Sequence, residues 1–189
     1  MALPDTTMLT FRTVGHGAQA AESFAGLVAG AGVAHVVDVR SFPGSRRHPH
    51  FGRAALEEWL PAAGVGYSWD PRLGGRRRPV PGSRHVGLEH DAFRAYADHM
   101  ESPEFAAGVA DLLDLAAGRG TGEVAVMCAE SLWWRCHRRL LADCLVLLNG
   151  AAVEHLMPDG RLAPHRPTDA ARVEDTRLVY DVGRTGPML

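Results

Sequence analysis

The sequence predicts an α/β fold: a single domain with a mainly parallel β-sheet and helices on both faces, a Rossmann-like three-layer sandwich. Short apolar or β-branched runs alternate with segments of helical periodicity as far as Met157. This alternation is typical of a parallel sheet covered on both sides. No internal repeat or linker divides the 189 residues. We therefore expect one α/β domain over 1–189, with 158–189 as a C-terminal wrapping tail.

The first half of the chain contains three strand-like runs. Residues 8–14 have the pattern of a strand that stops at a Gly-His-Gly turn, 33–39 is a short β-branched run, and 65–69 is a third strand. Apolar residues at spacings of three and four predict helices over 20–31 and 53–63.

The second half continues the alternation. Residues 91–100 are helical in pattern, and Ser102-Pro103-Glu104 places an N-cap, a first-turn proline and an early acid before a helix to about Ala117. The apolar run 123–127 predicts a buried strand that ends at Cys128. A helical pattern follows, takes in 135–139 and closes at 149–150, and 151–157 is the fifth strand.

Composition and charge limit the function classes. The formal net charge of −2 gives no strong indication of a nucleic-acid or acidic-lipid partner. No apolar stretch approaches the roughly 20 residues that span a membrane, and no signal peptide is evident. The three cysteines form no disulfide framework, which predicts a cytoplasmic protein without a membrane partner.

Charged and polar side chains follow the predicted strands. His16 follows the first strand, Arg40 and Ser41 the second, an arginine-rich loop the third, and Cys128 the fourth. In open parallel sheets ligands bind beyond the carboxyl ends of the strands, so we expect these groups to converge at one edge. Arginine forks beside a cysteine predict an anion-binding pocket with a nucleophile.

Two long loops, 41–52 and 70–88, are richer in Gly, Pro and Arg than a compact α/β unit requires, and connections of that length are usually functional or disordered. By contrast, 89–114 carries seven acidic residues and one arginine. From the two loops and the segment after Cys128 we expect a ligand-binding set of nine residues: His16, Arg40, Ser41, Ser45, Arg46, Gly74, Gly75, Arg135 and Arg138.

Four residues are candidates for catalysis. A cysteine at a strand end that precedes a helix favours a thiolate, which makes Cys128 the expected nucleophile, although a buried cysteine also serves as a small hydrophobic residue. Glu130 or His137 would transfer protons. Cys136 would resolve an oxidised intermediate, or it would pack in the core, because it shares a helical face with Cys144.

Metal binding has a weak signal. Five residues offer nitrogen or sulfur ligands, but the chain has no C-x-x-C and no H-x-x-x-H motif, so we assign no metal ligands and leave the cofactor unknown. The five are Cys128, Cys136, His137, His155 and His165.

The sequence resembles the domain-of-unknown-function 488 family of bacterial and archaeal proteins from roughly Thr13 to His165. The most specific mark is Cys-Ala-Glu at 128–130 followed by Cys-His-Arg at 136–138. Other marks are Val-Gly-His at 14–16, Val-Asp-Val-Arg-Ser-Phe-Pro at 37–43 with Ser-Arg at 45–46, and Leu-Gly-Gly at 73–75. The resemblance implies a compact α/β domain with a shared pocket, and no established reaction.

These observations predict a small cytoplasmic enzyme that acts on an anionic small molecule through a thiolate. Sulfur transfer, acyl transfer and redox chemistry are all compatible with it. An alternative is a binding module whose arginine-rich loops grip a phosphate, a nucleotide or a nucleic acid, with a structural cysteine. A third alternative is a protein-interaction domain that uses the acidic helices of 91–117.

Overall fold

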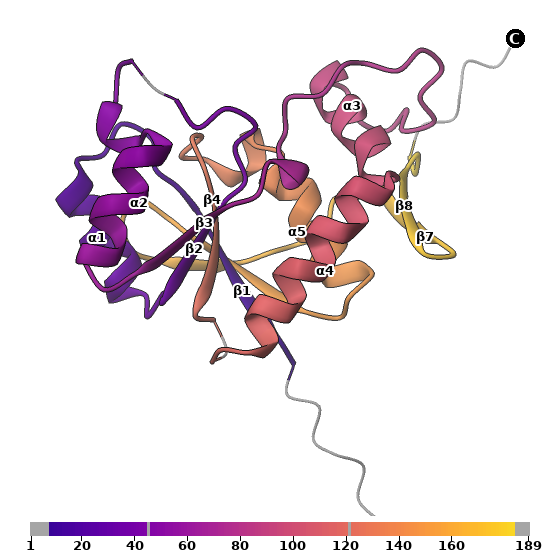
Figure 1. Ribbon diagram of the computed structural model, residues 1–189. Coiled ribbons are helices and arrows are strands. Elements are labelled where there is room, and N and C mark those ends of the chain that lie inside the picture. The colour runs from indigo at the N-terminus through magenta and orange to yellow at the C-terminus, as the bar shows by residue number, and fades with distance from the viewer. Residues whose placement is uncertain (1–7, 45, 121, 184–189) are drawn as a thin grey trace, which may run out of the picture.

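The computed structural model describes residues 8–44, 46–120 and 122–183, and it has the predicted three-layer α/β architecture (Figure 1). The main sheet has six strands in the order β3-β2-β4-β1-β5-β6. The first five in this order are parallel, and β6 is antiparallel to β5. Their bounds are β1 (Thr10–Gly15), β2 (His35–Asp38), β3 (Gly66–Trp69), β4 (Val124–Cys128), β5 (Ala152–Leu156) and β6 (Leu162–Pro164).

Helices cover both faces of this sheet. α1 (Ala21–Gly30) and α2 (Arg53–Ala62) lie on one side. α3 (Asp91–Met100), α4 (Pro103–Ala117) and α5 (Arg138–Leu147) lie on the other. The predicted start of α4 is confirmed, since the Ser102 hydroxyl accepts a hydrogen bond from the Phe105 amide at 3.1 Å.

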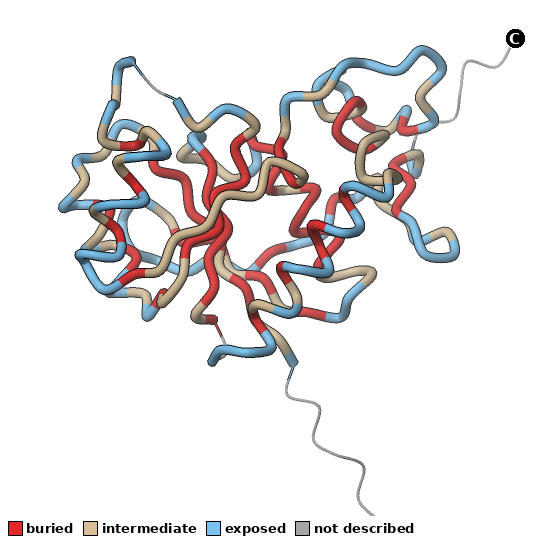
Figure 2. The backbone as a smooth tube through the Cα atoms, in the orientation of Figure 1, coloured by how far each residue is buried: buried red, intermediate tan, exposed pale blue. Residues whose placement is uncertain are grey.

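The hydrophobic core is split into two layers by the sheet. Side chains of β4 alternate between the two layers. Ala125 and Met127 face α1 and α2, whereas Val124 and Val126 face the helices on the opposite side. All of β4 is buried, and the sheet forms the buried centre of Figure 2. Burial on both faces explains why the central strand is a continuous apolar run.

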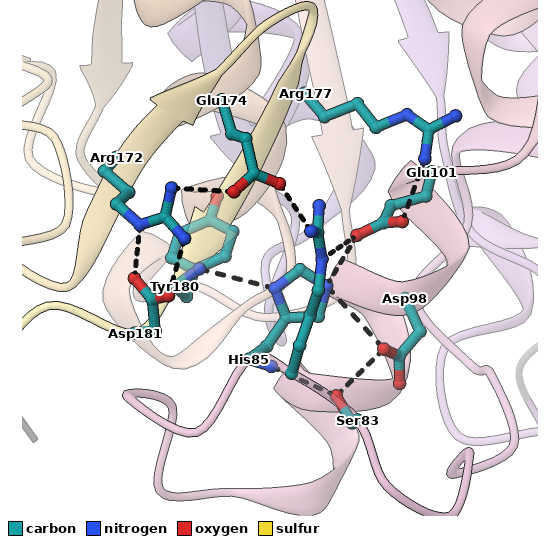
Figure 3. Close-up of polar contacts among 10 residues, drawn as sticks. Ser83, His85, Asp98, Glu101, Arg172, Glu174, Arg177, Tyr180 and Asp181 are labelled. Atoms are coloured by element: carbon teal, nitrogen blue, oxygen red, sulfur yellow. Dashed lines mark hydrogen bonds and ion pairs between the residues drawn. The ribbon is translucent and has the colours of Figure 1, made fainter.

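The C-terminal part adds two pieces to this core within its described residues. β6 extends the sheet next to β5, and a separate hairpin of β7 (Ala171–Glu174) and β8 (Arg177–Tyr180) lies beside α3 (Figure 1). Ion pairs of Arg84 with Glu101 and Glu174 connect the loop before α3, the residue that follows α3 and the hairpin. Figure 3 shows Glu101 and Glu174 within this cluster of polar contacts. Among the described helices, none is long and apolar enough to cross a membrane.

The expected position of Cys128 at a strand end is confirmed, since it is the last residue of β4. The expected start of the following helix is wrong, because α5 begins only at Arg138. Between them, Trp133–Arg135 form a 3-10 turn, and Cys136 has an extended backbone with φ −122° and ψ 150°. The extended Cys136 cannot share a helical face with Cys144, because the helix begins after it.

The sheet has its topological switch point at the carboxyl ends of β1 and β4. These strands are neighbours, with Gly15 opposite Cys128. The chain leaves β1 toward α1 on one face and leaves β4 toward α5 on the other. Neighbouring connections that diverge in this way open the crevice in which α/β proteins bind ligands.

Candidate functional site

A pocket of about 350 Å³ lies beyond the carboxyl ends of β2 and β4. Its walls come from the loops that follow β2, β3 and β4 and from the start of α3. Eight of the residues predicted as site residues line it: Arg40, Ser41, Gly75, Cys128, Glu130, Arg135, Cys136 and His137.

Two thiols and an imidazole meet in one wall of this pocket. Nδ1 of His137 lies 3.6 Å from Sγ of Cys136 and 3.9 Å from Sγ of Cys128. The three ligand atoms all lie within 4.8 Å of one another. Cys128 is held by the end of β4, and His137 by its place directly before α5. The loop between them folds Cys136 back beside Cys128.

Arg138 is the buried cation of this site. Its side chain is 1% exposed, its Nε donates to Sγ of Cys136 at 3.4 Å, and its Nη2 donates to the carbonyl of Glu130. Across the described part of the chain, no carboxylate forms an ion pair with it. A buried guanidinium needs a counter-charge, and the sulfur of Cys136 is the group in position to supply one.

The environment separates the pKa values of the two thiols. Burial opposes ionisation of Cys136, but a hydrogen bond from the Cys128 thiol and the charges of His137 and Arg138 hold its pKa well below the ordinary value. The pKa of Cys128 is raised by the hydrogen bond of its thiol to Cys136 and by burial. The contact of the Arg138 guanidinium with Sγ of Cys136 therefore favours ionisation of Cys136 over ionisation of Cys128.

Arg40 has most of its donors occupied. Its Nε and Nη2 donate to the two carboxylate oxygens of Asp38 at 2.8 and 2.6 Å, and Nη2 also donates to the carbonyl of Phe51. Its Nη1 lies 3.2 Å from Nε2 of His16. One of the five guanidinium N–H groups is left for the pocket. Asp38 therefore neutralises Arg40.

The exposed rim of the pocket carries charges without partners. The side chains of Arg76, Arg135 and Glu130 line it. Within the described ranges, none of the three has a side-chain hydrogen bond or an ion pair. Two free guanidinium groups beside one carboxylate suit an anionic ligand.

Five predicted ligand-binding residues are not among the described residues that line the pocket. His16 stacks on Phe51 at 4.1 Å and contacts Arg40, so it supports the site from behind. Arg138 is not in the pocket lining, but it contacts the sulfur of Cys136, which is. The other three are Gly74, which packs against Ser41, Arg46, which is exposed away from the pocket, and Ser45, which lies outside the described residues.

Two glycines of the sequence motifs are explained by close approaches. A Cβ at Gly15 would lie 1.9 Å from the carbonyl oxygen of Glu130. A Cβ at Gly75 would lie 2.3 Å from Nδ1 of His137. These glycines let the loop after β4 and the His137 ring pack against neighbouring backbone, so they shape the site and need not touch a ligand.

The same three donors could hold a metal ion. Cys128, Cys136 and His137 are the group of potential ligands found in the described residues, and Cys and His are ligands of zinc. A metal-bound histidine normally donates its second ring nitrogen to a partner, whereas Nε2 of His137 is buried without one. His155 and His165, also considered as ligands, hydrogen-bond to each other at 2.9 Å.

A buried polar chain behind the site escaped the sequence analysis. Nδ1 of His155 lies 2.7 Å from the Thr13 hydroxyl, its Nε2 lies 2.9 Å from Nδ1 of His165, and Nε2 of His165 lies 2.9 Å from Asp143. Trp133 stacks on the ring of His155. The available signal was a histidine inside a strand whose other residues, apart from Glu154, are apolar.

Gly75→Ala is expected to destabilise the protein and disturb the site. The new methyl group would overlap the ring of His137, and overpacking of this kind costs about 1–3 kcal/mol. Urea unfolding measures the loss. Gly44→Ala is the matched control, because a Cβ at Gly44 meets nothing within 4 Å. Equal free energies of unfolding for both variants would contradict the close contact.

Acid is expected to destabilise the fold through two buried histidines. Burial and the charge of Arg40 lower the pKa of His16 to about 4. Burial and His165 lower the pKa of His155 to about 3. The unfolded chain binds protons at both residues below about pH 6.5, and the folded protein does not, so the free energy of unfolding falls as the pH drops through 6.5.

The expected loss is about 2 kcal/mol for each histidine between pH 7 and 5, measured by urea unfolding. In His16→Asn the loss should be smaller than in the wild type by about the share of one histidine. The same loss in both proteins would show that His16 is protonated alike in the folded and unfolded states.

A match to a known family includes most residues of this site. The model of the domain of unknown function DUF488 matches residues 20–145. This range contains Arg40, Cys128 and the Cys-His-Arg segment 136–138, and it ends before β5 and His155. No curated protein and no solved structure matches the chain.

Proposed function

The chain belongs to the DUF488 family, and we propose that it is an enzyme that acts on an anionic small molecule through a thiolate at Cys136. The observation that carries this proposal is the buried Arg138 guanidinium, which has the Cys136 sulfur and no carboxylate as its partner. Cys128, the nucleophile expected from the sequence, serves as the proton donor beside it.

The chemistry is nucleophilic substitution. The Cys136 sulfur gives an electron pair to an electrophilic atom of the bound anion and forms a bond to it. The bond from that atom to its leaving group breaks, and the leaving group takes the electron pair and the proton of Cys128. Water then releases the group from Cys136, and its proton returns to Cys128. His137 lies close enough to both sulfurs to carry this proton.

The distribution of arginines favours a small ligand over a nucleic acid. In the loop after β3, Arg72 pairs with Asp70 and Asp111, and Arg77 donates to backbone carbonyls. Trp69, the aromatic residue directly before this loop, already has the Arg53 guanidinium over its ring at 4.4 Å. Few arginines of this loop are therefore available to bind the phosphate groups of a nucleic acid. Arg76, by contrast, lines the pocket at its rim.

Protection of Cys136 from alkylation tests the proposal. Cys136 would be modified with uncharged iodoacetamide in the presence of inorganic phosphate, sulfate or acetate, at a constant ionic strength set with chloride, and followed by peptide mapping. We expect at least one anion to slow the modification severalfold. The double variant Arg76→Gln/Arg135→Gln should lose this protection.

Arg78→Gln is the control, because Arg78 is exposed and outside the pocket lining. Protection that persists unchanged in the double variant would contradict the assignment of the anion site. A single-stranded oligonucleotide that protects better than every small anion, with a steep dependence on salt, would replace the enzyme with the binding-module alternative.

A further inference from the structure

We propose that His155 is a positioning residue: its ring is the platform that sets the place of Trp133 and, through it, of Cys136. This inference rests on the proposed role of Cys136. It concerns a residue outside both the pocket lining and the part of the chain that the family model matches.

The contact between the two rings is direct. Trp133 stacks on His155 with ring centroids 4.0 Å apart and an interplanar angle of 7°. Trp133 opens the 3-10 turn, and its carbonyl accepts a hydrogen bond from the amide of Cys136 at 3.1 Å. The position of the Trp133 ring therefore helps to set where the backbone of Cys136 lies, together with the amide of Arg139, which donates to the Cys136 carbonyl at 3.0 Å.

The His155 ring is itself fixed on both edges. Thr13, directly opposite in β1, lies 2.7 Å from Nδ1, and His165 lies 2.9 Å from Nε2. A carboxylate only accepts hydrogen bonds, so Nε2 of His165 donates to Asp143. In a neutral His165 ring, Nδ1 then accepts from His155. Each of these side chains is buried, so the chain of hydrogen bonds is shielded from water.

The far end of the chain is anchored in the C-terminal hairpin. Asp143 also accepts hydrogen bonds from the Thr168 amide at 2.9 Å and from the Tyr180 hydroxyl at 3.1 Å. The Tyr180 amide lies 3.4 Å from Nδ1 of the buried His85, within the ion-pair network of the hairpin (Figure 3). The platform is thus supported by β1, β5, α5 and β8 together.

The position of the Cys136 backbone also affects the charge balance at the Cys136 sulfur. Cys136 receives its counter-charge from Arg138 at 3.4 Å. A displacement of the Cys136 backbone by an ångström or two would weaken that contact and move the sulfur toward solvent. Loss of the platform should therefore change the ionisation of Cys136 and not only the stability of the fold.

The test compares His155→Leu, Trp133→Leu and the double variant with the wild type. We expect each single variant to raise the pH of half-maximal Cys136 alkylation by about one unit and the double variant to raise it no further, because both remove the same contact. Val153→Ala, a buried change in the same strand, is the control for general destabilisation and should leave the half-point unchanged.

An unchanged half-point in His155→Leu, or additive shifts in the double variant, would overturn the inference. Hydrogen exchange of the amides of 132–136 provides a readout that does not depend on the thiolate. It should accelerate at least tenfold in His155→Leu and not in Val153→Ala. If the wild-type half-point is ordinary, the proposed function fails, while the exchange data still decide whether His155 positions the loop.

Discussion

Replacing Arg138 by methionine is expected to raise the pH of half-maximal Cys136 alkylation by about two units, because an opposite charge in contact typically shifts a pKa by 1–3 units. The physical reason is the 3.4 Å contact between Nε and the sulfur at a site where both side chains are almost fully buried. Alkylation rates between pH 5 and 10, resolved by peptide mapping, give the half-point for each cysteine.

Arg139→Met is the matched control, since Arg139 is the next residue and donates to Thr168 instead. It should leave the half-point of Cys136 in place. Arg138→Lys should retain part of the shift, because it keeps a charge but cannot make both contacts of the guanidinium. A half-point that is the same in Arg138→Met and the wild type would show that another group balances the thiolate.

Arg40→Met is expected to cost about 3–5 kcal/mol of the free energy of unfolding, the usual effect of removing one partner of a buried ion pair. Asp38 is completely buried. Without Arg40 it keeps hydrogen bonds from Tyr67 and from the backbone amide of residue 40, but it has no cation beside it. Urea unfolding measures the loss.

Arg53→Met provides the comparison, because its ion pair with Glu57 is exposed and such pairs contribute about 1 kcal/mol or less. The double variant Asp38→Asn/Arg40→Met should recover part of the stability lost in Arg40→Met, since it removes the unpaired charge. If Arg40→Met unfolds like Arg53→Met, Arg40 is not a structural partner of Asp38 and is free to bind a ligand.

The sequence was sufficient to predict the layers of the fold because its patterns are local. The β-branched run before Asp38 and the Ser-Pro-Glu start of α4 each encode an element without help from distant residues. Five parallel strands with helices on both sides follow from their alternation. The start of α5 was not predictable in this way. Helical spacing extends back to Arg135, but the turn at 133–135 is held by a stack on His155, twenty-two residues farther along the chain.

The sequence placed part of the pocket lining at one edge of the sheet, but it did not specify which side chains contact each other there. Strand ends of a parallel sheet converge, so Arg40, Cys128 and Gly75 could be placed at one edge. Which thiol is ionised depends on Arg138, and which arginine is free depends on Asp38. Both are pairings in three dimensions that residue types and spacing do not specify. The Thr13–His155–His165–Asp143 chain joins β1, β5, α5 and the segment after β6, and it leaves no motif in the sequence.

The most direct test of the central proposal is the pH dependence of alkylation of Cys136 and Cys128 in the wild-type protein after treatment with a chelator. We expect a half-point for Cys136 well below the value of about 8.5 of a free cysteine, and a half-point for Cys128 above it. A half-point for Cys136 at or above 8.5, or a Cys128 that ionises first, would contradict a thiolate held at Cys136 by Arg138.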